Sequence, residues 1–351
     1  MHHGQQRDHL LARIIAQIRD RTFPYEPRED KLRDWSSYDE AQVNELDDVL
    51  NLIRRSVDQV PRLPEVKHRN RGRPPEHDEH DLAKIVLLQQ YFGASNRVME
   101  GYSRVFLEKL RLSRSVPYKA IERAYDDPRV KRVLDDVFAL TQQPERGRVT
   151  GMTVDGSGLP ESVKQNWERD KSAKKGNGRF DGSVVMLTVP HQIITAHTSL
   201  RAGFENESPL LEPLLDQTRQ HHPYLGIVSA DAAFLSRKNC TLIENAGGIP
   251  RIAPKKNVTV FKRIGSDAWI HMLMDLIADP QAWLRDYHQR SLSETGWSTH
   301  KRRHPRPLRR RIPYRRVSEK HARFTVDNLV RLAYLSRLHE VKIEWKAGSA
   351  A

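Results

Sequence analysis

Short apolar segments alternate with helix-like segments between residues 148 and 253, and this order limits the chain to few folds. The apolar runs are bounded by Gly, Pro or polar turns, so each predicts a strand. Three strands in succession, followed by strands that return through helices, predict an α/β fold with a mixed sheet flanked by helices. The predicted strands are 149–154, 184–189, 193–196, 226–230 and 249–253, with helices starting at 208 and covering 236–246.

Two aspartates stand where predicted strands end. Asp155 closes the first strand before a Gly-Ser-Gly turn, and Asp231 follows the fourth. Ligand-binding groups of α/β sheets collect at strand ends, so these carboxylates are expected to lie together. A third carboxylate, Glu294, lies in a helical region predicted over 266–303, with a break at the Asp-Pro of 279–280. Three carboxylates in one place need cations to stay ionised, so the pattern indicates a divalent-metal site.

The stretch from 287 to 301 places four functional groups on one face if it is helical. At about 100° per residue, an arc of about 60° contains Tyr287, Arg290, Glu294 and Lys301. The carboxylate could hold a metal while the phenol, guanidinium and ammonium hold phosphates. A solvated charged face is the alternative interpretation. Gly296 is unfavourable inside a helix, and a kink there would carry Lys301 away from the other three.

The charge of the chain favours a polyanionic partner. Lys and Arg number 59 against 45 Asp and Glu in 351 residues, for a formal net charge of +14, so nucleic acid is the leading partner class. The single cysteine, Cys240, excludes a disulfide framework and a cysteine-based zinc finger, and no cluster of His or Cys indicates zinc. No apolar run is long enough to cross a membrane, so we expect a soluble, cytoplasmic, nucleoid-associated protein.

Helical periodicity dominates the chain before residue 148. Amphipathic helices are predicted over 8–19 and 39–55, and shorter helices with Gly or Ser-Pro punctuation follow from 81 to 140. The later group could form a helix-turn-helix that reads DNA, and a plain helical bundle is the alternative. Basic side chains around the break between these helices favour DNA. They are Arg104, Lys109, Arg111, Arg114 and Lys119.

A basic segment separates the two helical groups. Its Arg-Gly-Arg-Pro core, with Arg71 and Arg73, resembles an AT-hook, in which an extended Arg-Gly-Arg lies in the minor groove of A·T-rich DNA. A solvated linker is the alternative. These changes in composition predict a helical region, a basic linker, a helical DNA-binding region, a catalytic domain and a tail. Their boundaries are 1–66, 67–80, 81–147, 148–340 and 341–351.

Over about 150–340, these motifs resemble the DDE transposases of bacterial and archaeal insertion sequences. The four residues from Tyr287 to Lys301 match the Tyr-x2-Arg-x3-Glu-x6-Lys signature of one group of that family. Val-Asp-Gly-Ser around Asp155 resembles the first aspartate motif, 230–234 the second, and the basic 250–257 the stretch that follows. Relatives often carry Gly-Tyr after the second aspartate, where this chain has Ala-Ala-Phe, so the geometry of that turn is left open.

The resemblance implies a ribonuclease-H-like domain that cleaves DNA at the ends of the element and transfers the strand to target DNA. Asp155, Asp231 and Glu294 would be the catalytic residues and would hold two Mg²⁺ or Mn²⁺ ions. A homodimer would assemble on paired double-stranded ends. The predicted DNA contacts are Tyr287, Arg290, Lys301, Arg71, Arg73, Lys255, Lys256, Arg302 and Arg303. For Tyr287, Arg290 and Lys301 a structural ion network is the alternative.

Arginines are dense between Lys301 and residue 316. Like charge at this density is expected not to pack without a polyanion, which favours contact with the DNA backbone, and a disordered segment is the alternative. An amphipathic helix over 324–338 is expected to close the chain by packing on the sheet.

Two other functions fit the same residues. One is a transposase-derived DNA-binding protein that no longer cuts, and the other is a ribonuclease-H-like nuclease without strand transfer. The presence of all three carboxylates and of the signature favours an active transposase.

Overall fold

The computed structural model describes residues 2–26, 34–62, 64, 77–160, 180–200, 206–260, 266–339 and 341–345. Contacts divide the chain into two compact units. The sheet unit consists of Met1–Arg33, Arg146–Gly158 and Arg179–Ser298, and the helical unit of Asp34–Glu145, Leu159–Gly178 and Thr299–Ala351. These units group the chain differently from the five linear segments predicted from composition.

None of the helices in these ranges is long and apolar enough to span a membrane.

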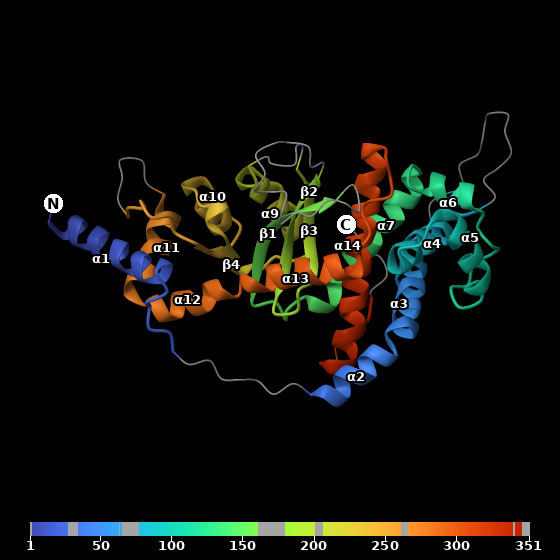
Figure 1. Ribbon diagram of the computed structural model, residues 1–351, viewed down its shortest axis with the longest axis horizontal. Coiled ribbons are helices and arrows are strands. Elements are labelled where there is room, and N and C mark those ends of the chain that lie inside the picture. The colour runs from blue at the N-terminus through green and yellow to red at the C-terminus, as the bar shows by residue number, and fades with distance from the viewer. Residues whose placement is uncertain are drawn as a thin grey trace. The chain divides into compact units, whose positions relative to one another are not determined.

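The sheet unit is built on a five-stranded mixed sheet in the order β3-β2-β1-β4-β5 (Figure 1). β1 runs parallel to β4, β4 runs parallel to β5, and β2 and β3 form an antiparallel hairpin. The amide of Thr150, before β1, donates to the carbonyl of Val189 at the end of β2, so β1 and β2 run in opposite directions. The topology is ribonuclease-H-like, as predicted. The bounds are β1 Gly151–Pro160, β2 Phe180–Val189, β3 Ile194–Ser199, β4 Gly226–Ala230 and β5 Gly248–Ile252.

The sequence predicted that β1 ends at Asp155, and this prediction is wrong. The Gly-Ser-Gly segment that follows Asp155 continues the strand to Pro160. What ends near Asp155 is the pairing with β4, whose last matched pair is Val154 with Ala230. Glycine and serine allow an extended backbone as readily as a turn, so composition alone could not separate the two.

The sheet unit contains the N-terminal helix and the helices that follow β3 as far as Ser298 (Figure 1). α9 contacts β2 and β3, α10 contacts β5, and α12 contacts β4 and β5. α1 packs on α11, and its Leu11 and Ile14 join the core of the sheet. The bounds are α1 His2–Arg19, α9 Leu211–Arg219, α10 Arg237–Asn245, α11 Asp267–Ala278, α12 Pro280–His288 and α13 Ser291–Arg303.

The region from 266 to 303 is interrupted twice. The predicted break at Asp279 is confirmed, because Asp279 caps α12 by accepting a hydrogen bond from the amide of Ala282. A second break, at 289–290, separates α12 from α13, so the assumption of one helix from 287 to 301 is wrong. Arg251 of β5 is buried and pairs with Asp275 of α11 at 3.1 Å and Asp286 of α12 at 3.3 Å. This ion-pair set ties both helices to the sheet.

The helical unit is a bundle around α4, which is buried on nearly all sides. Asp78 caps its first turn, and Gly93 ends it in the left-handed conformation with φ 57°. α14 packs on α7, α4 and α3, so the expectation that it covers the sheet is wrong. The bounds are α2 Trp35–Val43, α3 Glu45–Gln59, α4 Glu79–Phe92, α5 Asn96–Val105, α6 Tyr118–Ala124, α7 Pro128–Gln142 and α14 Pro313–Leu338.

Gly226 fixes the start of β4 against β1. Its φ is +60°, and a Cβ there would overlap the carbonyl of Thr150. Only glycine meets both conditions, so Gly226 supports the register that carries Asp231 to its position.

We predict that Gly226→Ala destabilises the protein by at least about 1–3 kcal/mol, because it combines backbone strain with steric overlap. The measurement is chemical denaturation followed by circular dichroism. Gly101→Ala is the matched control: Gly101 lies in α5 with nothing within 4 Å of an added Cβ, so this change should stabilise by about 0.5–1 kcal/mol. Equal effects of the two changes would contradict the role given to Gly226.

Candidate active site

Asp155 and Asp231 follow the last matched pair of two adjacent parallel strands, so they meet at one edge of the sheet. The amide of Gly156 donates to Asp155 Oδ1 at 2.9 Å. The amide of Ala233 donates to Asp231 Oδ1 at 2.7 Å and closes the short turn η3, Ala232–Phe234. The Ala-Ala-Phe sequence that departs from the family pattern thus forms a capped turn, with Phe234 fully buried beneath it.

Glu294 reaches this edge from the first turn of α13. Arg290 Nη2 donates to Glu294 Oε1 at 2.6 Å. The carbonyl of Arg290 accepts from the hydroxyl of Thr153 at 3.5 Å, and Trp297 Nε1 donates to the carbonyl of Asp155 at 3.3 Å. These two contacts hold the start of α13 against β1.

Tyr287 ends up beside Arg290 although the helix breaks between them. The guanidinium carbon of Arg290 lies 6.0 Å from the centre of the Tyr287 ring, which stacks on Trp283 with ring centres 5.4 Å apart. Burial raises the pKa of the Tyr287 phenol, so this group stays protonated at neutral pH. Three of the four signature side chains, Tyr287, Arg290 and Glu294, therefore lie together because of the turn at 289–290 and not because they share one helix face.

Glu207 is a fourth carboxylate at the same edge, and the sequence analysis missed it. A Cβ on Gly156 would overlap the Glu207 carboxylate, so glycine at 156 makes room for it. Burial, together with repulsion from Asp155 and Asp231, raises the pKa of Glu207 to about 7. The only signal in the sequence was an acidic residue just before the Ser-Pro helix start, which carries no metal-site spacing.

The carboxylates repel one another and are partly withdrawn from water. The pKa of Asp155 is raised to about 6, chiefly by burial. Repulsion from Asp231 and Glu294 contributes to this rise, and the amide of Gly156 and the Arg290 guanidinium oppose it. Carboxylate oxygens are the ligands that Mg²⁺ and Mn²⁺ prefer, and a divalent cation would remove this repulsion. The donor set thus fits the metal that the sequence predicted.

We predict that Asp155→Asn stabilises the metal-free protein at pH 8, with a rise in Tm of about 2–6 °C. The raised pKa of Asp155 keeps the folded state protonated to higher pH than the unfolded chain, so stability is lost as the pH rises from 3.8 to about 6. The gain should therefore shrink as the pH falls toward 4. Scanning calorimetry in EDTA measures it, and Asp216→Asn, at an exposed site on α9, is the control. A variant less stable than wild type at pH 8 would contradict the repulsion.

The remaining predicted DNA contacts fall in several places. Lys255 and Lys256 are exposed beyond the end of β5, at the same sheet edge as the aspartates. Lys301 is half-buried and Arg302 exposed in the part of α13 that belongs to the helical unit. α13 runs unbroken through Gly296, so no kink occurs there. Arg71 and Arg73 lie outside the residues that the structure describes.

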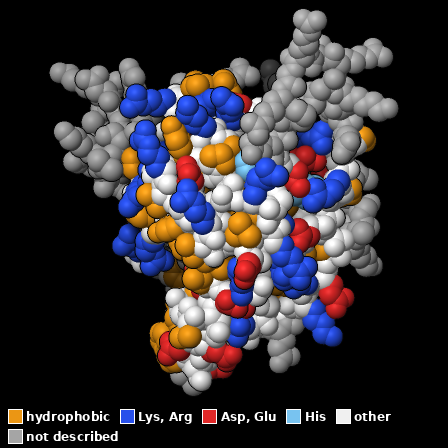
Figure 2. Space-filling model, turned by 90° about the vertical axis from the view of Figure 1, so that its right-hand side faces the viewer, with side chains coloured by type: hydrophobic (Ala, Val, Ile, Leu, Met, Phe, Trp, Pro, Cys, Tyr) orange, Lys and Arg blue, Asp and Glu red, His pale blue; other side chains and the backbone are white. Residues whose placement is uncertain are grey.

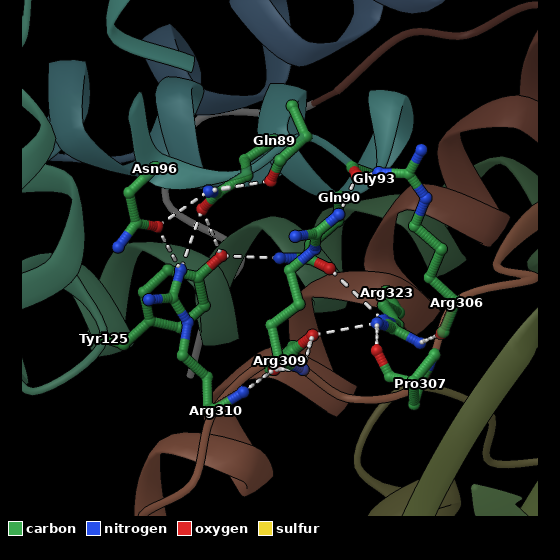
Figure 3. Close-up of polar contacts among 12 residues, drawn as sticks. Gln89, Gln90, Gly93, Asn96, Tyr125, Arg306, Pro307, Arg309, Arg310 and Arg323 are labelled. Carbon is green, nitrogen blue, oxygen red and sulfur yellow. Dashed lines mark hydrogen bonds and ion pairs between the residues drawn. The ribbon is translucent and has the colours of Figure 1, made fainter. Parts of the chain in front are cut away.

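The arginine-rich segment packs without a polyanion, contrary to the sequence-based expectation (Figure 3). Buried Glu319 accepts hydrogen bonds from the amides of Arg309 and Arg310 and from the Arg323 guanidinium at 2.8 Å. Arg310 donates to Gln89 and Asn96 and stacks over Tyr125 at 3.8 Å. Side-chain amides, one buried carboxylate and an aromatic ring therefore satisfy charges that composition assigned to DNA.

Two further arginines of this group are also paired within the helical unit. Arg303 forms a two-pronged contact with Glu45 at 2.9 and 3.3 Å, and Arg315 pairs with Glu122 and Asp126. Arg303 is thus less available to DNA than its neighbour Arg302.

Basic side chains remain on the surface, as Figure 2 shows for one face of the molecule. Lys and Arg are spread over this face among hydrophobic side chains rather than gathered in one patch. α5 contributes exposed Val98, Tyr102 and Val105. The distribution of basic side chains does not indicate which helix between residues 81 and 140 would read DNA.

Comparison with known proteins identifies the family. Residues 147–339 match the family model described as Transposase DDE domain. The match covers more than half of the chain, and the protein belongs to this family of DDE transposases. A protein of Archaeoglobus fulgidus named "Probable transposase for insertion sequence element ISA1214" is 25% identical over 310 residues, which cover 87% of each chain. Membership in the group with the Tyr-Arg-Glu-Lys signature stays a prediction.

Proposed function

We propose that this chain is an active transposase of the Tyr-Arg-Glu-Lys group, which cuts DNA at the ends of its insertion sequence and joins the freed strand to target DNA. The observation that supports this most is the meeting of Asp155, Asp231 and Glu294 at one sheet edge within a chain of the DDE family. Glu207 adds a fourth carboxylate there.

The proposed chemistry is two displacements at phosphorus. Water first attacks the phosphodiester at the element's end and releases a 3′-hydroxyl, and that hydroxyl then attacks a phosphodiester of target DNA and releases a new 3′-hydroxyl. Two Mg²⁺ or Mn²⁺ ions would supply activation of the attacking oxygen and charge neutralisation at the leaving oxygen. Asp155, Asp231 and Glu294 are the residues proposed to hold them.

Arg290 has a second partner in this proposal. Its ion pair with Glu294 neutralises that carboxylate in the metal-free chain. If bound cations neutralised Glu294 instead, the Arg290 guanidinium could hold a DNA phosphate in a two-pronged contact. Tyr287, Lys255 and Lys256 flank the same edge and would hold neighbouring phosphates. Lys301 and Arg302 are proposed as DNA contacts farther along α13.

Two other functions predict different products. A DNA-binding protein without activity would bind element ends and leave them intact. A nuclease would cut but would not join a pre-cut 3′ end to plasmid DNA. A homodimer on paired ends is part of our proposal and would give a complex with two chains and two DNA ends.

We predict that Glu294→Gln abolishes Mg²⁺-dependent cutting, because it removes a metal-binding charge, while binding of end DNA changes only a few-fold. The assay uses DNA from the two flanks of the reading frame, with cleavage followed on gels and binding by anisotropy. Glu212→Gln is the control, since Glu212 forms an exposed ion pair with Lys238 on the sheet unit. Equal loss of cutting and binding would mean that Glu294 is structural, and absence of cutting by wild type would overturn the enzyme proposal.

Arg302 and Arg310 should separate DNA contact from internal packing. We predict that Arg302→Ala changes the free energy of unfolding by less than about 0.5 kcal/mol. The slope of log K against log salt for DNA binding should fall by about 1, which corresponds to the loss of one phosphate contact. Arg310→Ala should destabilise by about 2–4 kcal/mol, because it removes buried hydrogen bonds and a cation–π contact. Denaturation and salt titrations measure both. An unchanged salt slope for Arg302→Ala would remove it from the DNA contacts.

A further inference from the structure

Two histidines and an aspartate meet inside the helical unit, and none of them is among the residues proposed above to hold metal or DNA. His300 lies in the last turn of α13, His304 follows one turn later, and Asp327 lies on α14. His300 Nδ1 is 2.5 Å from Asp327 Oδ2, and His304 Nε2 is 3.0 Å from Asp327 Oδ1. Both imidazoles are buried, with 4% and 9% of each residue exposed.

This set has the composition and spacing of a transition-metal site. One ligand atom from each residue lies within 4.8 Å of the other two. A tetrahedral zinc ion with bonds of about 2.0–2.1 Å holds its ligand atoms about 3.3 Å apart, so small side-chain rotations would suffice to bind it. Histidines four residues apart share one helix face, which is why both rings converge on a single carboxylate.

The surrounding charges permit a cation here. Arg303 and Arg323 act electrostatically on Asp327 and His304, respectively. Each guanidinium already has its own carboxylate: Arg303 pairs with Glu45 at 2.9 Å and Arg323 with Glu319 at 2.8 Å. The negative charge of Asp327 is therefore directed to the two imidazoles.

We propose that His300, His304 and Asp327 bind one Zn²⁺ ion, with a fourth position for water. Two nitrogens and one oxygen select zinc over Mg²⁺, which prefers oxygen ligands only, so this site is chemically distinct from the carboxylate edge of the sheet. The sequence contained the His-x3-His spacing, but the third ligand comes from another helix and left no local pattern.

The site would act as a clamp on the arginine-rich segment. The chain between His304 and α14 contains Arg309 and Arg310, whose amides are held by Glu319. A metal bound on both sides of this segment closes it into a fixed loop. Zinc should therefore stabilise the folded chain by an amount that grows with the logarithm of its affinity.

The test uses the full-length protein carrying Asp155→Asn, Asp231→Asn and Glu294→Gln, which removes all three metal ligands proposed for the carboxylate edge. After EDTA treatment and loading with Zn²⁺, gel filtration and elemental analysis should find about one zinc per chain, and zinc should raise Tm. Adding His304→Asn or Asp327→Asn should abolish both effects. Adding His321→Asn, which alters a different His–Asp pair, formed by His321 of α14 with Asp135 of α7, should leave both intact.

Zinc retained equally by His304→Asn, or not retained by the parent protein, overturns the proposal. X-ray absorption on the zinc-loaded parent protein makes the test independent of whether a variant folds. Two imidazole nitrogens at about 2.0–2.1 Å are expected. A shell of oxygen ligands only would also overturn the proposal, and neither outcome bears on whether the protein cuts DNA.

Discussion

The parallel pairing of β1 with β4 determines where the acidic groups of the candidate site lie. Four matched pairs, from Gly151 with Ile227 to Val154 with Ala230, carry Asp155 and Asp231 to adjacent positions. A slip of one residue would turn the side chains of one strand to the opposite face of the sheet. Gly226 fixes the start of β4 against β1. The hydrogen bonds of Thr153 and Trp297 hold the start of α13 against β1, so both neighbours of β1 are kept in place.

That alignment brings together charges that oppose folding in the absence of a cation. Asp155 and Glu207 both have raised pKa values, and Glu294 is neutralised by Arg290. Carboxylates crowded in this way lower the stability of the fold, and a divalent cation would offset that cost. The buried His300–Asp327–His304 set differs, because its carboxylate is balanced by imidazoles rather than crowded by other acids.

Local patterns predicted the five strands, the break at Asp279 and the position of Asp231 after β4, because apolar runs and Asp-Pro act within a few residues. They placed Asp155 at the end of a strand that in fact continues to Pro160. Local patterns gave wrong or missing predictions where contacts between residues far apart in the sequence determine the structure. On either side of the break at 289–290, α12 contacts β4 and β5, and the start of α13 is hydrogen-bonded to β1. α14 buries its apolar face on helices rather than on strands. Glu207 and Asp327 reach their sites only through tertiary structure. The net charge also misled, since Arg310 is satisfied by Gln89, Asn96 and Tyr125.

We propose that Asp155, Asp231 and Glu294 hold divalent metal together. Iron-mediated hydroxyl-radical cleavage tests it directly: Fe²⁺ is bound to the protein, ascorbate and peroxide are added, and the backbone breaks are mapped by mass spectrometry. Breaks near all three residues and near Glu207, suppressed by excess Mg²⁺ and lost in Asp231→Asn, are the predicted result. Breaks at none of these positions, or a pattern unchanged by Asp231→Asn, would contradict the account.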